Sequence, residues 1–131
     1  MPVDLVAPGT PALRAFVRDT LGCTCPETVF DVVRRGERAL GSGASFIRLV
    51  IGDRLLVYLV GAGAGTARVV ELAAAGLRDR DASGLNRFRL VVGLPAGAAQ
   101  AGELADGFAA AVAGDPKAHL HCVPAVACGG I

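Results

Sequence analysis

The stretch FIRLVIGDRLLVYLV, residues 46–60, decides the fold. Two apolar runs flank the Gly-Asp pair at 52–53, and glycine supplies the positive φ that a two-residue type I′ or II′ turn requires. The pattern predicts a β-hairpin in which Leu49 faces Leu56. Because apolar side chains point to both sides of each strand, we expect both faces of the sheet to be covered, as in layered α/β proteins.

Helical and strand patterns surround this hairpin on both sides. Before it we expect an extended arm at 1–9, helices at 10–21 and 26–35, and a loop at 36–45. After it we expect a helix from 66 to 77, a charged loop at 78–84, a strand at 86–92, a helix at 98–113, a strand at 117–123 and a tail at 124–131.

This order of elements predicts a single α/β domain over residues 1–131. Two N-terminal helices precede a mixed four-stranded sheet, built from the β-hairpin followed by two βα crossovers. The last three strands are linked by helices, so we expect them to run parallel through right-handed crossovers. Helices should then cover both faces of the sheet.

Composition excludes several classes of function. The formal net charge is +1, which argues against a nucleic-acid binder that works by electrostatics, and the absence of tryptophan argues against stacking on bases. No apolar run approaches the roughly 20 residues that span a bilayer, so we expect no membrane partner. The N-terminus has no basic and apolar leader, so we expect a cytoplasmic protein whose four cysteines are reduced.

The pair Cys23-Thr24-Cys25 directly precedes Pro26. Proline favours the first position of a helix, so Cys25 is expected at the N-cap, where unpaired N–H groups and the helix dipole favour a thiolate. Cys25 would then be the attacking thiol and Cys23 the resolving thiol of a dithiol–disulfide cycle. Alternatively, the two thiolates bind a metal, Cys25 acts alone as a nucleophile, or both are ordinary half-buried thiols.

A second group of metal-binding side chains lies near the C-terminus, at His119, His121, Cys122 and Cys128. With Cys23 and Cys25, a subset of them could complete a tetrahedral zinc or iron–sulfur site. On a strand over 117–123, His119 and His121 share one face and Cys122 takes the other, so these three cannot all join one site. The two histidines can equally be a strand-end pair with satisfied hydrogen bonds.

Charged side chains concentrate at 78–81 and in Asn86-Arg87-Phe88-Arg89. Arg87 and Arg89 fall on one face of their strand. If buried, they need carboxylate partners; beside the cysteines, they could bind an anionic substrate or favour thiolates; otherwise they form an ion-paired surface. The candidate carboxylates are Asp79, Asp81 and Glu27. The glycine-rich loop at 61–66 lacks residues that a nucleotide-binding motif requires, and we interpret it as an ordinary β–α turn.

Two segments, LGCTCPETVF at 21–30 and GLNRFRLV at 84–91, resemble the signatures LGCxCPxxVF and GxNRFRxV of a small, uncharacterised prokaryotic family of α/β proteins. The hairpin segment GDRLLVY at 52–58 fits the same family. The resemblance spans roughly residues 13–92 and carries no established activity. It implies that the Cys-x-Cys and Asn-Arg-Phe-Arg segments are the shared features.

The leading hypothesis is a thiol-based redox or thiol-reactive protein that acts on a thiol or disulfide partner protein. Its site residues would be Cys23, Cys25, Asn86, Arg87 and Arg89. The first alternative is a zinc or iron–sulfur module, with ligands drawn from Cys23, Cys25, His119, His121 and Cys122. The second is a non-enzymatic interaction domain that forms a homodimer through a sheet edge.

Overall fold

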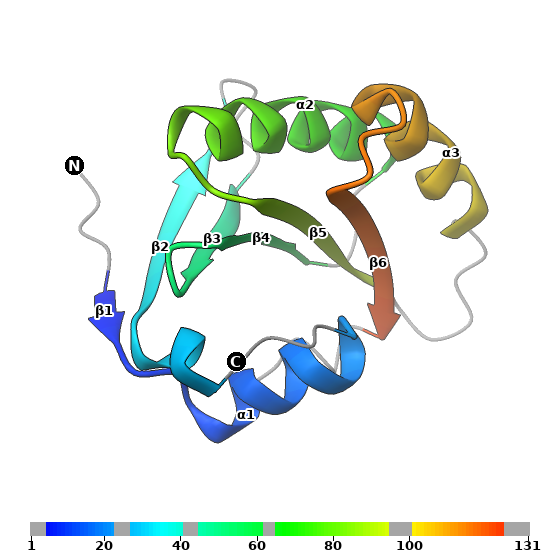
Figure 1. Cartoon of the computed structure of the whole chain (residues 1–131). Helices are drawn as coiled ribbons and strands as arrows, with labels where there is room; N and C mark the ends of the chain where they lie inside the picture. The colour runs from blue at the N-terminus through cyan, green and yellow to red at the C-terminus, as the bar shows by residue number, and fades with distance from the viewer. Residues whose placement is uncertain (1–4, 23–26, 41–44, 62–64, 95–100, 125–131) are drawn as a thin grey trace.

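The computed structural model describes residues 5–22, 27–40, 45–61, 65–94 and 101–124 (Figure 1). The strands are β1 Leu5–Ala7, β2 Val33–Ala39, β3 Ser45–Ile51, β4 Leu55–Val60, β5 Arg87–Leu94 and β6 Ala118–Pro124. The α-helices are α1 Pro11–Ala15, α2 Thr66–Ala82 and α3 Ala101–Val112. A π-helical turn, η1 Phe16–Thr20, continues α1, and a 3₁₀ turn, η2 Glu27–Asp31, precedes β2.

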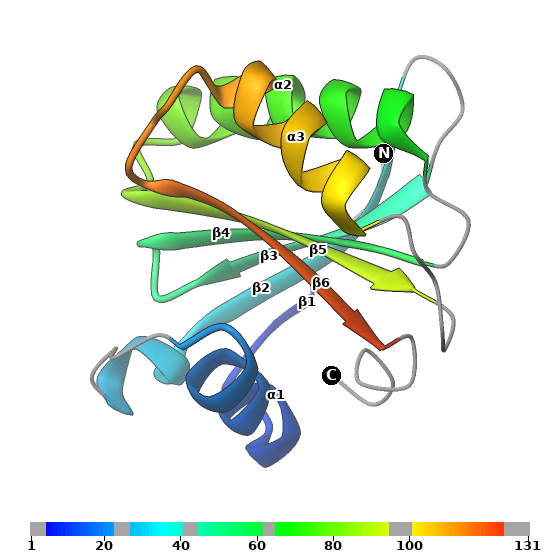
Figure 2. The ribbon, with the colours of Figure 1, turned by 90° about the vertical axis from the view of Figure 1, so that its right-hand side faces the viewer.

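The strands form one six-stranded sheet in the order β1-β2-β3-β4-β5-β6. The first four strands pair antiparallel, whereas β4, β5 and β6 run parallel and are linked by α2 and α3 (Figure 2). The parallel pairing expected for the last three strands is therefore present. The expected four-stranded sheet behind two N-terminal helices is wrong, because β1 and β2 extend the sheet from its antiparallel side.

The missing strand β2 lies where the sequence predicted a helix at 26–35 and a loop at 36–45. Val29, Phe30 and Val33 have helical spacing, yet the helix is reduced to the short turn η2. β2 pairs with β3 from Val33↔Ile51 to Ala39↔Ser45. β3 is apolar on both faces and needs a neighbour for its free backbone groups, so sheet pairing outweighs local propensity. Part of the expected arm at 1–9 forms β1 in the same way.

The β3–β4 hairpin turns at Gly52-Asp53, as expected, but its loop covers residues 52–54 instead of two residues, and its register differs. Gly52 and Asp53 both have positive φ, at 61° and 54°, and the Arg54 N–H donates to the Ile51 carbonyl at 3.2 Å. Pairing then resumes one residue later, as Ile51↔Leu55, because the Arg54 carbonyl accepts hydrogen bonds from the start of β5. The predicted pairing of Leu49 with Leu56 is wrong, and every β4 side chain moves to the opposite face.

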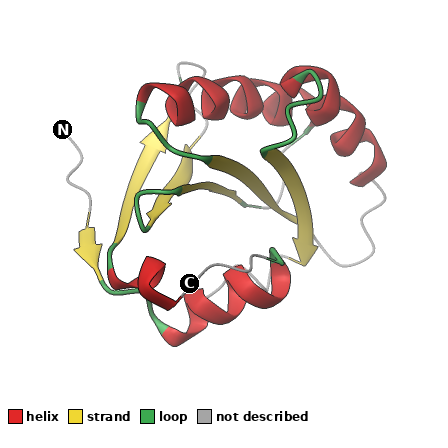
Figure 3. Cartoon of the chain, viewed as in Figure 1, coloured by secondary structure: helices red, strands yellow, loops and turns green. Residues whose placement is uncertain are grey.

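Helices cover both faces of the sheet, α2 and α3 on one side and α1 with η1 and η2 on the other (Figure 3). We call these the α2/α3 layer and the α1 layer. Each encloses its own apolar core. The largest fully buried side chains under the α2/α3 layer are Phe88, Leu56, Leu72, Leu90 and Leu104. Those under the α1 layer are Phe30, Leu49, Ile51, Val17 and Val57.

Some of the helix ends lie where the sequence predicted them, and others do not. Thr10 caps α1, as expected, by accepting a hydrogen bond on its side-chain oxygen from the Leu13 N–H at 3.2 Å. The predicted charged loop at 78–84 is wrong over most of its length, because α2 continues to Ala82. None of the described helices combines the length and the hydropathy needed to cross a membrane.

Candidate functional site

β5 carries Arg89 into the space between the sheet and the end of η1. The side chain is only 9% exposed. Its Nη1 donates to the Leu21 carbonyl at 2.9 Å and lies 2.8 Å from Nε2 of His121. Its Nε is buried and has no hydrogen-bond partner. One guanidinium thus joins β5, β6 and the residue that ends the N-terminal helix.

Strand alternation explains this placement. On β5, Phe88 and Leu90 pack under the α2/α3 layer, so Arg89 points to the α1 layer. In the parallel pairing of β5 with β6, Arg89 lies opposite His119 and Val91 opposite His121. Both histidines therefore share the side of Arg89.

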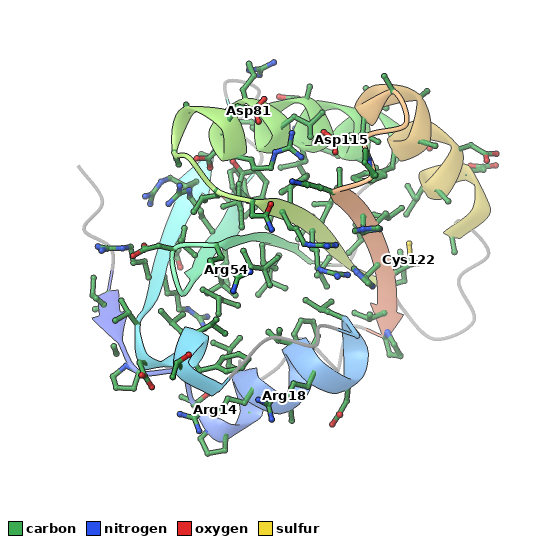
Figure 4. All side chains as sticks on the ribbon, in the orientation of Figure 1. Arg14, Arg18, Arg54, Asp81, Asp115 and Cys122 are labelled. Atoms are coloured by element: carbon green, nitrogen blue, oxygen red, sulfur yellow. The ribbon has the colours of Figure 1, made fainter. Side chains whose placement is uncertain are left out.

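Cys122 points the other way. Its half-buried side chain packs against the α2/α3 core, and Figure 4 shows its sulfur on that side of β6. Burial raises the pKa of this thiol. The structure thus separates Cys122 from His119 and His121, as the alternation of β6 predicted.

The surroundings of Arg89 are electrostatically positive. Burial, and then the charge of Arg87, lower the pKa of Arg89. Burial, followed by the charges of Arg89 and His119, lowers the pKa of His121 to about 4. The pKa of His119 is lowered too, by burial and then by Arg89 and Arg87. Both imidazoles are neutral at neutral pH, and Nε2 of His121 accepts from Arg89 while Nδ1 carries the proton.

The carboxylates expected to pair with the buried arginine are engaged elsewhere. Asp79 lies under the α2/α3 layer and accepts two hydrogen bonds from Arg48, at 2.7 and 2.8 Å. Asp81 pairs with Arg80 on α2, far from the α1 layer (Figure 4). The side chain of Glu27 lies outside the described residues. Among the residues that are described, Arg89 makes no ion pair with a carboxylate.

Of the other predicted site residues, Asn86 and Arg87 are described by the structure and the cysteines of the motif are not. Asn86 is exposed, and its Oδ1 accepts a hydrogen bond from Lys117 Nζ at 3.0 Å. Arg87 is exposed and precedes Arg89 by two residues, so it lies on the same side of β5. Cys23, Cys25 and Cys128 fall outside the described residues.

A polar network beneath α2 was not predicted from the sequence. Asp79 accepts hydrogen bonds from Arg48, from Tyr58 at 2.6 Å and from Ser83 at 2.9 Å. Burial alone would raise the pKa of Asp79, but these three donors outweigh burial and lower it. Burial and the bond to Asp79 raise the pKa of Tyr58. The signal in the sequence was Arg48, a lone charge in an otherwise apolar strand.

This geometry suits an anion better than a metal cation. Within the described part of the chain, no three His, Cys, Asp or Glu side chains come together as metal ligands. The Arg89 charge repels cations, and its hydrogen bond occupies Nε2 of His121. A buried cation without a carboxylate attracts thiolates and oxyanions instead.

Comparisons of the chain with models of protein families, with curated proteins and with solved structures find no match. The resemblance in the Cys-x-Cys and Asn-Arg-Phe-Arg segments therefore stays a prediction.

Proposed function

We propose that this protein is a thiol-based redox protein in which Cys23 and Cys25 are the reacting groups. One observation carries the proposal: Arg89, a buried cation, binds the carbonyl of Leu21, two residues before Cys23. A positive charge beside a cysteine lowers the thiol pKa and raises the thiolate fraction. The charge of Arg89 is not neutralised by any carboxylate among the described residues.

Covalent geometry limits the distance over which this charge acts. Consecutive Cα atoms are about 3.8 Å apart, so on any path the Cα of Cys23 lies within about 7.6 Å, and that of Cys25 within about 15 Å, of the Cα of Leu21. At such distances a unit charge contributes on the order of 1 kcal/mol near a protein surface. That energy corresponds to a little under one pKa unit, which is about fivefold more thiolate at neutral pH.

The proposed reaction is the reduction of a disulfide in a partner protein. The Cys25 thiolate attacks one sulfur of that disulfide, the S–S bond breaks, and the other sulfur leaves as a thiolate that takes up a proton. The Cys23 thiol loses its proton and attacks the Cys25 sulfur in the mixed disulfide. The second partner sulfur leaves, so the partner gains two electrons and two protons, and the Cys23–Cys25 pair becomes the disulfide.

The electrostatics favour this function over a zinc or iron–sulfur module. A metal site near Leu21 would place a second positive centre beside Arg89. It would also need the lone pair that His121 gives to the guanidinium. An interaction domain without thiol chemistry would leave the buried cation without a role.

The redox equilibrium of the Cys23–Cys25 pair tests this proposal. Cys122 and Cys128 are first replaced by serine, and the protein is equilibrated in glutathione buffers of graded potential. Thiol-specific alkylation and intact mass then give the fraction of disulfide. We expect a two-electron transition within the range of glutathione buffers, absent in a further Cys23→Ser variant. A pair that stays reduced in the most oxidising buffer would rule the proposal out.

A further inference from the structure

Two arginines and a neutral histidine on the α1 side of the sheet form a basic cluster, which we call the Arg87 patch. It consists of Arg87, Arg89 and His119. Arg87 and Arg89 are two residues apart on β5 and therefore share one face of the sheet. His119 lies opposite Arg89 on β6. Arg87 is exposed, His119 is half-buried and Arg89 lies beneath them at 9% exposure. The patch therefore leads from solvent to a buried guanidinium.

The hydrogen bonds of Arg89 leave part of its donor capacity unused. Nη1 makes both of the contacts described above, to Leu21 and to His121. Nε is buried without an acceptor. A guanidinium presents parallel N–H groups that match the two oxygens of a carboxylate or phosphate.

An unpaired buried charge is costly. Removing a cation from water costs several kcal/mol, which folded proteins offset with a counter-charge. No carboxylate of the described residues supplies one here, and the ionisable neighbours Arg87, His119 and His121 are all bases. An anion recruited from solution or from a substrate would supply that counter-charge.

We propose that the Arg87 patch binds an oxyanion, a carboxylate or phosphate group, carried by the substrate of the thiols. Its role as part of that substrate rests on the proposed function; the binding of the anion itself does not. Arg89 would donate to the oxygens from within, and Arg87 would hold the group at the surface. The thiol partner would thus carry an acidic or phosphorylated group beside its reactive sulfur.

The test uses the full chain with Cys23→Ser and Cys25→Ser, so that no motif thiolate can occupy the site. Inorganic phosphate and acetate are titrated separately at constant ionic strength with chloride as the balancing ion. The ¹⁵N–¹H signal of Arg89 Nε reports binding at the residue, and calorimetry gives the affinity. A tighter complex with phosphate identifies a phosphate group, and a tighter complex with acetate identifies a carboxylate.

We expect saturable binding of one of the two ions, with movement of the Arg89 signal. Arg89→Met should weaken binding about tenfold, the loss of one charge-assisted bidentate contact. Arg87→Met, which changes an exposed side chain and leaves the fold intact, should weaken binding by a smaller factor. The matched control is Arg78→Met, which removes an exposed arginine from α2 on the other side of the sheet.

Two results would overturn the inference. One is an Arg89 signal that neither ion moves. The other is an affinity that is the same in the Arg87→Met and Arg78→Met variants. Because the cysteines are absent from this protein, a failed redox proposal would leave the anion binding intact, and failed anion binding would leave the redox equilibrium measurable.

Discussion

At the residue scale, the hydrogen bond between Arg89 and His121 makes stability depend on pH. The unfolded imidazole has a pKa of about 6.5, whereas burial and Arg89 lower the folded value to about 4. Between these values the unfolded chain binds more protons, so acidification from pH 6.5 favours unfolding. We expect the free energy of unfolding in urea to fall between pH 7 and pH 5.

The variant His121→Gln tests whether His121 causes the slope of the free energy of unfolding against pH. Glutamine keeps an acceptor for Arg89 and does not titrate. The slope should become shallower without vanishing, since His119 also has a lowered pKa. The lowered pKa values of Asp79 and Asp115 make stability depend on pH in a more acidic range. Their stabilisation is complete above about pH 4 and disappears below it. An unchanged slope between pH 5 and 7 would contradict the assignment.

Asp79 gives a second prediction at this scale. Its carboxylate holds Arg48 in a part-buried pair, so Asp79→Asn leaves that cation without its counter-charge. We expect a loss of about 2–3 kcal/mol in the free energy of unfolding. Tyr58→Phe removes one hydrogen bond to the same carboxylate and should cost about 1 kcal/mol. Urea denaturation of both variants at pH 7 measures the two losses, and the reverse ranking would refute this account of the network.

Single-residue features could be predicted where a local rule governs them. The Thr10 cap and the shared side of Arg87 and Arg89 follow from the sequence. The partners of the charges could not be predicted, because strand alternation does not reveal which helix covers which face. Asp79 therefore looked equally available to Arg89, although it lies in the opposite layer with Arg48.

At the element scale, Gly76 sets how closely α2 approaches the sheet. A Cβ at this position would overlap the ring of Phe88 on β5. Alanine is the better helix former by about 1 kcal/mol, yet Gly76→Ala should destabilise the protein. We expect a net loss of about 1–3 kcal/mol, typical of overpacking in a core. Thermal and urea unfolding both measure it.

The matched control is Gly102→Ala on α3, where an added Cβ meets nothing within 4 Å. This variant should be neutral or slightly more stable, because only the helix propensity changes. A stabilising Gly76→Ala would show that α2 packs farther from β5 than described.

Element boundaries were predictable where hydrophobic periodicity agreed with tertiary pairing. The strands β3 to β6, the helix α3, and α1 together with η1 were expected within a few residues of their observed places, whereas α2 runs on to Ala82. β2 was missed because its charged residues and the preceding Val29-Phe30 pair read as a helix. The register of the hairpin was predicted wrongly because the Arg54 carbonyl accepts hydrogen bonds from the start of β5. No local sequence pattern reveals this contact.

At the scale of the whole molecule, the mixed sheet places two unlike polar clusters on its two faces. The α2/α3 side holds the closed Arg48–Asp79 network, in which charges are balanced. The α1 side holds Arg89, whose charge is not balanced by any described carboxylate. On this asymmetry we propose a structural role for the first cluster and a functional role for the second. It emerges only from the assembled sheet, because the sequence places acids and bases close together at 78–89.

The central claim, that Arg89 favours thiolates at Cys23 and Cys25, is tested most directly by the pH dependence of their alkylation. Iodoacetamide rates are followed by peptide mass spectrometry in the wild-type protein and in the Arg89→Met and Arg78→Met variants, with Cys122 as the internal reference. The account predicts that Cys25 reacts with a kinetic pKa below the ordinary value of about 8.5. It also predicts a rise by a little under one unit in Arg89→Met alone. An ordinary kinetic pKa that is the same in all three proteins would contradict the claim.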